Sequence, residues 1–436
     1  MSSQKIAIIG GGIAGLTAAR YLYEHHDIEL FEYNDYIGGH THTLDVNIEG
    51  KTYPVNTGFI VYNDWVYHNF NKLMAGLSVE RLPTEMSFSV TDEVTGLEYN
   101  GHNLDSLFAQ RKNLFSPAFY KMIRDILRFN KESLADLEAG KLAESTTLRE
   151  YFSEKGLGAM FVNKYIVPMG AAIWSSGEAD MLDFPVLFFV RFFKNHGLLS
   201  VKNRPQWYVL EGGSRSYIDP LIEPFKHRIT KNARIQTVTR HHDHVALTFE
   251  DGQVKTFDQV IFACHSDQAL ALIADATSEE TSVLSAIPYS KNEVVLHTDE
   301  SLLPRSKKAW AAWNYHLGED KSKPASLTYN MNILQRFDDA PVTFCVTLNN
   351  SERIDPSKVI ASYQYAHPVF NLGSIEAQGR YHEIGNKNRT HFCGAYWFNG
   401  FHEDGVNSAI RVVEDIKAQH TSQRKNPASS SAVVAS

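Results

Sequence analysis

The first residues with a clear chemical meaning are glycines spaced for contact with a diphosphate. Residues 10–15 read Gly-Gly-Gly-Ile-Ala-Gly, a GxGxxG sequence between an apolar β-branched run and a segment with helical apolar spacing. Gly10 permits a tight turn, Gly12 lets backbone N–H groups approach a pyrophosphate, and Gly15 lets a helix pack on a strand. We therefore expect a dinucleotide to contact Gly10, Gly12, Ile13, Ala14 and Gly15.

An acidic residue stands where a ribose would lie. Glu32 ends the second apolar run, 22 residues after Gly10, and a carboxylate there accepts hydrogen bonds from an adenosine ribose 2′-OH. The same charge disfavours a 2′-phosphate. FAD and NAD carry the same ADP half, so this fingerprint alone does not distinguish them.

The residues that follow favour FAD. The run LFEYNDYIGGH, residues 30–40, resembles the second glycine signature of the flavin-containing amine oxidase and phytoene desaturase superfamily, in which Gly-Gly-Arg is the usual ending. His40 replaces that arginine. Segments similar to three further superfamily motifs follow in the same order, at residues 211–214, 257–264 and 392–409.

This resemblance implies a non-covalently bound FAD and a larger set of cofactor contacts. His40 is the candidate catalytic residue, because imidazole can hydrogen-bond the cofactor or relay a proton near neutral pH. The alternative is that His40 only holds its own loop. Ala395 departs from the superfamily pattern, since an acid commonly stands there. The implied contacts are Gly38, Gly39, His40, Thr41, Val238, Gly394, Glu403, Gly405 and Val406.

Four shorter motifs give a closer resemblance. They resemble motifs of a subgroup of predicted NAD/FAD-binding proteins. The four are GGHTHT (38–43), NTGFIVYN (56–63), PMGAAIWS (168–175) and GFHEDG (400–405). That subgroup often occurs beside cyclopropane-fatty-acid-synthase-like methyltransferases, and some members are implicated in desaturating phospholipid acyl chains. The resemblance implies a lipid or other apolar small-molecule substrate, a methyltransferase partner and peripheral membrane contact.

Aromatic residues are dense in residues 179–199. Five phenylalanines fall on successive turns there, too many for a solvated helix. Such a helix either lines an acyl tunnel or is an ordinary core helix. The expected substrate-lining residues are Trp174, Phe188, Phe192, Trp397 and Phe401.

Two positions argue against amine oxidation. Superfamily amine oxidases carry a lysine on the strand that corresponds to residues 292–298, and Glu293 takes its place here, with Lys291 two residues earlier on the same strand face. Phe401 corresponds to a tyrosine of their aromatic cage. Both changes weaken an assignment to amines without removing it.

The histidines and cysteines predict no metal site and no disulfide framework. The 19 histidines include no HExxH motif, and Cys264, Cys345 and Cys393 are far apart with no CxxC pair. A reducing compartment fits this pattern.

The elements that must position these groups begin with a βαβ unit: strands at residues 5–10 and 28–32 flank a helix at residues 14–26. Residues 103–205 look helical, with Ser116-Pro117 as a helix start. Further strands are expected at residues 234–240, 245–250, 254–263, 294–298, 325–329 and 342–348, with a turn at Asp251-Gly252 and a last helix at residues 407–420.

We therefore predict a two-lobe α/β protein. A Rossmann-like FAD-binding lobe of the glutathione-reductase type would comprise residues 1–77, 206–272 and 389–420, and a mixed α+β substrate lobe residues 78–205 and 273–388. Residues 421–436 read as a disordered tail. No second GxGxxG occurs in a strand–helix setting, so electrons would leave for oxygen, a quinone or a protein partner.

Composition limits the remaining choices. The chain has 436 residues, 43% hydrophobic and 21% charged, which excludes collagen-like and disordered classes. A net charge of −8 opposes binding to nucleic acid, although residues 103–205 carry 14 basic and 11 acidic residues, or +3. With no export signal expected, we predict a cytoplasmic protein that reaches the membrane surface only peripherally.

The functional hypothesis is an FAD-dependent oxidoreductase that oxidises or desaturates an acyl-chain lipid by hydride transfer to flavin N5. One alternative is a flavin amine oxidase acting on a small amine or polyamine. Another is a non-catalytic, flavin-holding accessory subunit of a lipid methyltransferase.

Overall fold

The computed structural model describes residues 3–174, 176–320 and 326–425. The chain divides into two compact units. Unit 1 contains residues 1–39, 217–287 and 376–436, and unit 2 contains residues 40–216 and 288–375. These bounds differ from the lobe boundaries expected above, most clearly at residues 40–77, which pack within unit 2.

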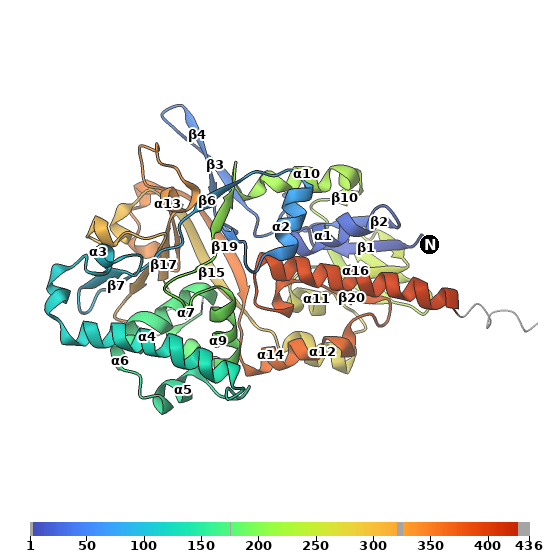
Figure 1. Cartoon of the computed structure of the whole chain (residues 1–436). Coiled ribbons are helices and arrows are strands. Elements are labelled where there is room, and N and C mark those ends of the chain that lie inside the picture. Colours follow the sequence, from blue (N-terminus) through green and yellow to red (C-terminus); the bar gives the residue numbers. More distant parts are fainter. Residues whose placement is uncertain (1–2, 175, 321–325, 426–436) are drawn as a thin grey trace, which may run out of the picture. The chain divides into compact units, whose positions relative to one another are not determined.

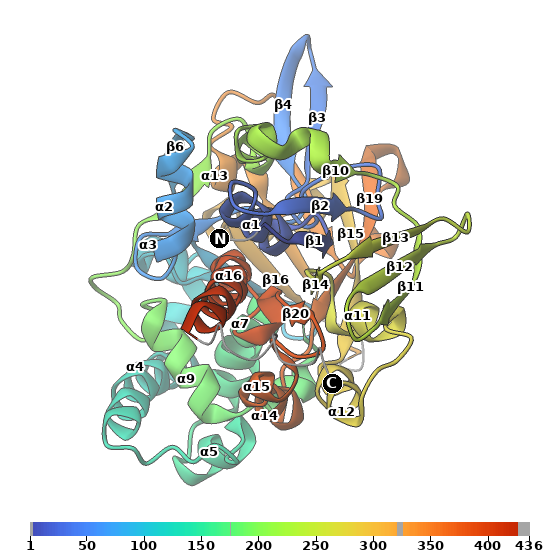
Figure 2. The ribbon, with the colours of Figure 1, turned by 90° about the vertical axis from the view of Figure 1, so that its right-hand side faces the viewer.

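Unit 1 is built on a five-stranded sheet in which every pair is parallel. Its apolar strands are buried, as expected for a sheet covered on both faces. This is the Rossmann-like sheet predicted from the sequence, and Figure 2 shows it with helices α1 and α16 beside it. The strand order is β10 (Ile229–Thr230), β2 (Asp27–Phe31), β1 (Lys5–Ile9), β14 (Gln259–Phe262), β20 (Thr390–Phe392).

Helix α16 (His402–Lys425) packs along α1 (Ile13–Leu22) in the same unit. It begins five residues before the expected start at Asn407, because Asp404 Oδ2 accepts a hydrogen bond from the Phe401 N–H at 2.9 Å and closes the first turn. The helix continues to Lys425, past the expected start of the tail, and residues 426–436 lie outside the described chain. The other helices of unit 1 are α10 (Ile218–Ile222), α11 (Ser266–Leu272), α12 (Ser278–Ser285) and α15 (Tyr381–Ile384).

An antiparallel ribbon of β11 (Ile235–Arg240), β12 (Val245–Phe249) and β13 (Val254–Phe257) completes unit 1. Gly252, with φ of 82°, makes the turn expected at Asp251-Gly252. The strand expected at residues 254–263 is instead two strands in different sheets. The chain passes from β13 to β14 at Asp258, whose carboxylate accepts the Lys5 N–H at 2.7 Å.

Unit 2 contains a mixed seven-stranded sheet, antiparallel except between β16 and β7. The expected strand at residues 325–329 appears as β17, which starts at Ser326; Ala325 lies outside the described residues. The strand order is β19 (Val359–Pro368), β15 (Tyr289–His297), β18 (Cys345–Leu348), β17 (Ser326–Asn330), β16 (Trp313–Leu317), β7 (Phe88–Asp92), β8 (Leu97–Asn100). Two smaller sheets pair β3 (Thr43–Ile48) with β4 (Lys51–Asn56), and β9 (Trp207–Leu210) with β5 (Tyr62–Asn63) and β6 (Arg81–Thr84).

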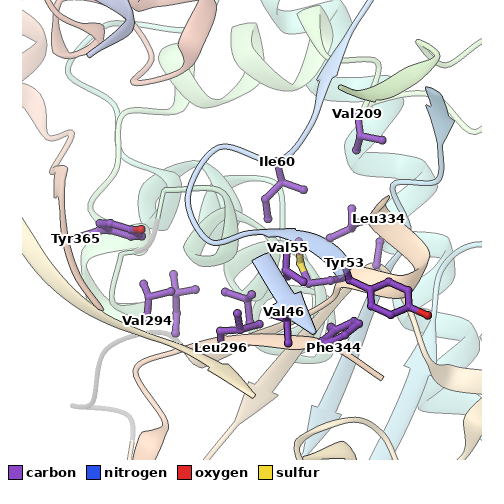
Figure 3. Close-up of a cluster of buried hydrophobic side chains, with 14 residues drawn as sticks. Val46, Tyr53, Val55, Ile60, Val209, Val294, Leu296, Leu334, Phe344 and Tyr365 are labelled. Atoms are coloured by element: carbon purple, nitrogen blue, oxygen red, sulfur yellow. The ribbon is translucent and has the colours of Figure 1, made fainter. Parts of the chain in front are cut away.

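The core of unit 2 explains why residues 40–77 belong to it. Tyr53, Val55 and Ile60 lie in one buried cluster with Leu296 of the large sheet and with Phe344, which precedes β18, and Figure 3 shows these side chains together. The rings of Tyr53 and Phe344 are 5.3 Å apart. The β3–β4 hairpin therefore buries its apolar face against the sheet that carries β15.

The helices of unit 2 lie mostly between residues 104 and 195 (Figure 1). Helix α4 (Pro117–Glu138) starts as expected, since Ser116 Oγ accepts the Phe119 N–H at 3.3 Å. The others are α2 (His68–Gly76), α3 (Leu104–Leu107), α5 (Leu148–Glu154), α6 (Ala159–Phe161), a π-helical turn (Val162–Ile166), α7 (Val167–Trp174), α8 (Glu178–Leu182), α9 (Val186–Asn195) and α13 (Met331–Gln335), while α14 (Leu372–Gly379) leads into unit 1. Among the described helices, none is both long enough and apolar enough to span a bilayer.

Candidate functional site: a dinucleotide cradle and a histidine–tyrosine cluster

The first glycine loop of unit 1 has no room for a side chain at Gly10 or Gly15. Gly10 has φ of 115°, and a Cβ atom there would lie 2.7 Å from the Ala263 carbonyl oxygen. A Cβ atom on Gly15 would lie 2.0 Å from the Gly10 carbonyl oxygen. Gly12 is different, because nothing lies within 4 Å of its Cβ position. The space beside Gly12 is therefore open to a ligand.

Two helix N-termini meet beside this loop. A Cβ atom on Gly405, in the first turn of α16, would lie 2.8 Å from Ile13 Cγ2 and 3.8 Å from the Ala14 nitrogen. Each helix start leaves backbone N–H groups without intrahelical partners and carries partial positive charge. The predicted contacts Glu403 and Val406 lie in the same turn of α16 and are buried. This pair of helix ends suits a pyrophosphate.

The carboxylate of Glu32 is held at the loop by backbone donors. Its Oε2 atom accepts the Gly11 N–H at 2.7 Å, and its Oε1 atom accepts the N–H and side-chain amide of Asn34, both at 2.8 Å. The side chain is buried at the end of β2. It is thus fixed where an acceptor for ribose hydroxyls is expected.

The second glycine pair packs on the first glycine loop. The Gly38 N–H donates to the Gly11 carbonyl at 2.9 Å, and a Cβ atom on Gly39 would lie 3.2 Å from the Gly12 Cα atom. Both glycines have positive φ, 129° and 58°. The two glycine signatures therefore form one cradle, and its open centre, buried carboxylate and paired helix ends fit the ADP half of FAD.

The other predicted cofactor contacts of unit 1 lie near the sheet. Val238 is buried on β11, and its carbonyl accepts the Ala274 N–H at 3.0 Å. The Gly394 N–H donates to Ser408 Oγ at 2.8 Å, which joins the end of β20 to α16. A Cβ atom on Gly394 would lie 2.3 Å from the Tyr396 ring. Their contact with FAD stays a prediction.

A cluster of histidine and tyrosine rings gathers in unit 2 around His40. Strand β19 places Tyr363, Tyr365 and His367 at alternate positions, hence on one face. The His40 ring lies 5.2 Å from the Tyr365 ring and 5.3 Å from the His367 ring. The His42 ring lies 4.8 Å from the Tyr363 ring.

Hydrogen bonds connect the members of this cluster. Thr57 Oγ1 lies 2.8 Å from the Tyr365 hydroxyl and 2.8 Å from His42 Nδ1. A continuous hydroxyl chain thus joins the buried Tyr365 to the half-buried His42. On the other side, the Asn292 side-chain amide lies 3.0 Å from His367 Nδ1.

The surroundings keep His367 neutral. Burial, assisted by the nearby His40, lowers the pKa of His367 to about 3. A neutral ring that accepts the Asn292 amide at Nδ1 carries its proton on Nε2. Burial and the charge of Arg215 also lower the pKa of His42.

Sequence reasoning found His40 but missed Tyr365, His367 and Asn292. The alternation of large polar rings in residues 363–367 was the available signal. Glu293, expected in place of the amine-oxidase lysine, is exposed together with Lys291 and hydrogen-bonds Ser351. The buried polar side chain of this part of β15 is Asn292, because neighbouring residues of a strand face opposite ways.

The glycine motif at residues 211–214 packs against the loop that carries His40. Asn56 Oδ1 accepts the Ser214 N–H and the Thr43 hydroxyl, both at 2.8 Å. A Cβ atom on Gly213 would lie 2.6 Å from Thr43 Cγ2. Thr41, a predicted cofactor contact, is buried in the same loop. Three motifs that are far apart in sequence thus fix one loop of unit 2.

Trp174 lies at the centre of an aromatic cluster in unit 2. Its ring is 4.7 Å from the rings of Phe184 and Phe192, and the half-buried Phe188 stacks on Phe370 at 5.6 Å. The indole Nε1 of Trp174 is buried and has no hydrogen-bond partner among the described residues. The cluster is therefore mainly aromatic; its polar groups include the unsatisfied Trp174 N–H and the His196 ring, which stacks on Phe192 at 3.8 Å.

The remaining two substrate-lining candidates lie in unit 1. Trp397 is 2% exposed, and its ring packs 5.0 Å from Tyr381 and 5.4 Å from the Arg411 guanidinium. Phe401 is half-buried at the start of α16. The environment of Trp397 is that of a core side chain, whereas three of the five candidates, Trp174, Phe188 and Phe192, share one cluster.

Comparison with known sequences supports a flavin fold. The family model of flavin-containing amine oxidoreductases matches residues 13–332, well over half of the chain. The flavin-dependent L-tryptophan oxidase of Lentzea aerocolonigenes is 25% identical over 291 residues, 57% of this chain and 55% of that protein. The 4,4′-diaponeurosporene oxygenase of Staphylococcus haemolyticus (strain JCSC1435) is 30% identical over 103 residues, 22% of this chain and 20% of that protein. The chain thus matches about half the length of these relatives, or less.

Solved structures show the same fold. A fatty acid isomerase from P. acnes superposes with a TM-score of 0.67 at 15% identity, covering 94% of this chain and 98% of that one. A putative protoporphyrinogen oxidase from Exiguobacterium gives 0.68 at 18% identity, covering 96% and 100%. The predicted FAD-type fold and FAD cofactor are confirmed. The chain belongs to the family of flavin-containing amine oxidoreductases.

Proposed function

We propose that the protein is an FAD-dependent enzyme that oxidises or desaturates an acyl-chain lipid. The observation that carries this proposal is the mainly aromatic cluster around Trp174, in which the indole N–H is buried without a partner among the described residues and the His196 ring stacks on Phe192 at 3.8 Å. Leaving a buried donor unsatisfied costs about 1–3 kcal/mol. An acyl ester matches this environment, because it offers a long apolar chain and a single carbonyl acceptor.

The short motifs of the His40 loop and of residues 168–175 support the same substrate class, since they resemble a subgroup implicated in acyl-chain desaturation. Fold does not choose the substrate: the same architecture carries a fatty acid isomerase and cyclohexylamine oxidase. The substrate is therefore inferred from the cluster and the motifs.

FAD, when bound, supplies the acceptor for a hydride from a substrate carbon. The residues that would hold it are the glycines of the cradle, Glu32, and the starts of α1 and α16. Desaturation also releases one proton from the neighbouring carbon, and a residue of the protein must accept that proton.

We assign the proton to His40. Its imidazole lies in ring contact with Tyr365, and the hydroxyls of Tyr365 and Thr57 lead to His42 Nδ1. Each hydroxyl can accept a proton on one side and donate one on the other, so the Tyr365 and Thr57 hydroxyls connect the surroundings of His40 with the half-buried His42. The neutral His367 fixes the opposite side of the cluster and adds no competing charge.

Product analysis tests the proposal. The FAD-loaded protein is incubated under air with detergent-dispersed phospholipids, and the acyl chains are examined by mass spectrometry. We expect a product that has lost two hydrogens, and slower formation in Trp174→Phe, which keeps an aromatic ring at this position but removes the N–H. Val254→Ala, on an exposed edge of unit 1, is the matched control. Absence of any oxidised acyl product contradicts the proposal.

Amine oxidation is the second candidate, favoured by the family match and by the similarity to L-tryptophan oxidase over 57% of the chain. The exposed positions of Lys291 and Glu293 argue against a lysine-assisted reaction. Hydrogen peroxide released on addition of amines, but not of lipids, would select it. A protein that binds FAD and responds to neither would be assigned the accessory role beside a methyltransferase.

A further inference from the structure

Exposed apolar side chains are concentrated in one short segment of unit 2. Among the described residues, thirteen large apolar side chains are exposed, and five of them lie between residues 104 and 127. Phe115 is 87% exposed and Leu104 is 76% exposed. Single exposed apolar residues are ordinary, but a group of them marks an interaction surface. The five are Leu104, Leu114, Phe115, Tyr120 and Leu127.

These residues lie in consecutive elements of unit 2, from α3 to α4. Phe108, the residue that follows α3, packs on the first turn of α4, where its ring lies 5.8 Å from the Tyr120 ring. On α4, the exposed residues Tyr120, Arg124, Leu127 and Lys131 recur every three or four positions, so they form one stripe. Phe115 ends the 3-10 turn Arg111–Phe115, which lies between α3 and α4 along the chain.

The same segment is strongly basic within an acidic protein. Residues 111–131 contain six lysines and arginines and one acid, a net charge of +5, whereas the whole chain carries −8. The one acid, Asp125, is buried. Asp105, which precedes the segment, is already paired with Arg111 and with Lys308, the latter at 3.1 Å.

A cleft of about 360 Å³ opens beside the segment. It is lined by Lys112 and Asn113 together with Met160 and Lys164. The Asn113 side chain is 6% exposed, and its amide nitrogen has no hydrogen-bond partner among the described residues. The lining of the cleft thus includes an exposed cation, Lys112, and Asn113 with its buried amide, two residues before Phe115 in the sequence.

We propose that this surface, formed by the five apolar residues above with Lys112, Lys121, Arg124 and Lys131, docks the protein on a bilayer that contains anionic lipids. Exposed rings insert among acyl chains while cations meet phosphate groups, the arrangement of interfacial segments. The cleft at Asn113 receives one phosphate head group. Nucleic acid would use the cations but would leave Phe115 and Leu104 in water.

Vesicle flotation tests the proposal with the full-length, FAD-loaded protein. Vesicles of phosphatidylcholine alone are compared with vesicles that also contain phosphatidylglycerol. We expect binding to the anionic vesicles to be at least about tenfold tighter and to weaken with added salt, because exposed charges are screened. No binding to either vesicle, or equal binding to both, overturns the proposal.

Two variants and their controls locate the surface. Phe115→Asp and the double variant Lys121→Glu/Arg124→Glu should each lower binding to anionic vesicles by about tenfold or more. Val254→Asp and Lys226→Glu/Lys231→Glu change exposed residues of unit 1 in the same way and should bind as wild type does. Normal vesicle binding by Phe115→Asp and by Lys121→Glu/Arg124→Glu contradicts the assignment. Equally weakened binding by the control variants contradicts it too. Far-UV circular dichroism and FAD content confirm that each variant folds.

Fluorescence gives a second readout. In Phe115→Trp, the new indole should become quenched by brominated acyl chains only when anionic vesicles are present. Sedimentation shows whether the segment instead joins two copies of the chain, an outcome that overturns the proposal. Docking requires no turnover, and the acyl reaction is assayed with detergent-dispersed lipid, so the failure of either proposal leaves the other distinguishable.

Discussion

The two units use different parts of the polypeptide for their chemistry. The cradle of unit 1 is made of backbone: glycines that leave no room for Cβ atoms, two helix starts and one carboxylate, nearly all within residues 10–39. The cluster of unit 2 is made of side chains from separate segments, with His40 and Thr57 meeting β19 more than 300 residues later. We therefore expect cofactor binding to depend on local backbone geometry, and substrate chemistry to depend on side chains that only the fold brings together.

The largest expected effect comes from filling the cradle. Gly15→Ala places a Cβ atom 2.0 Å from the Gly10 carbonyl oxygen, so the loop must shift. We expect protein that purifies without visible flavin absorbance and whose free energy of unfolding falls by about 1–3 kcal/mol. Gly76→Ala, at the end of α2 with nothing within 4 Å, should retain FAD. A Gly15→Ala protein with normal flavin content would disprove the backbone account.

Removing one hydroxyl of unit 2 should slow turnover without changing the binding of FAD. Tyr365→Phe breaks the hydroxyl chain to His42 and should slow turnover of lipid by about 100-fold, the size of a lost proton-transfer step. Flavin content should not change. Tyr363→Phe, on the same face of β19, is the matched control and should have nearly normal rates. Equal rates in both variants would remove Tyr365 from the proton path.

A smaller effect is expected at Glu32. Glu32→Gln removes the charge that strengthens its hydrogen bonds and should raise the dissociation constant of FAD about tenfold, or about 1.4 kcal/mol. At saturating FAD the turnover rate should match wild type. Glu29→Gln, on the same strand and paired with Lys5 and Lys255, should leave FAD affinity unchanged. Titration of the apoprotein by flavin fluorescence measures both.

Buried histidines in both units make stability sensitive to acid. Burial lowers the pKa of His391 in unit 1 to about 4 and that of His367 in unit 2 to about 3, from an ordinary value near 6.5. Below pH 6.5 these histidines bind protons in the unfolded chain but stay neutral in the folded protein. The free energy of unfolding therefore falls as the pH is lowered, until the pH reaches the pKa of each histidine in the folded protein. Each histidine contributes up to about 1.4 kcal/mol per pH unit.

Urea unfolding between about pH 8 and about pH 5, from roughly one decade below to roughly two decades above the proton activity of neutral water, measures this slope. His367→Gln and His391→Gln should each reduce it by roughly one proton, whatever their effect on stability at neutral pH. The exposed His227→Gln should leave the slope unchanged. A slope that is insensitive to both buried substitutions would show that these histidines are protonated in the folded state.

The sequence allowed much of unit 1 to be predicted, because its signals are local. The glycine spacing and Glu32 lie within one βαβ unit, and their partners are sequence neighbours or adjacent strands. The predictions of secondary structure were wrong where contacts between distant residues determine the strands. Residues 254–263 form two strands because Asp258 bonds to Lys5 of the first strand, 253 residues away.

Unit 2 was less predictable for the same reason. His40 was identified only as the neighbour of a glycine pair, and nothing near it in the sequence indicates Tyr365 or His367. Pairing of β15 with β19 brings Asn292 to His367, and alternation along β15 turns Glu293 to the exposed face. A shift of one residue along a strand reverses which side chain is buried, so an alignment cannot settle such a position.

The most direct test of the central claim is the visible absorbance spectrum of the purified protein, recorded under anaerobic conditions before and after phospholipid is added. We expect the bands of oxidised flavin at the start and their bleaching by lipid but not by amines, with slower bleaching in Tyr365→Phe. A spectrum that lipid leaves unchanged and that amines bleach would contradict the acyl-lipid assignment. A colourless protein that takes up no added FAD would contradict the cradle itself.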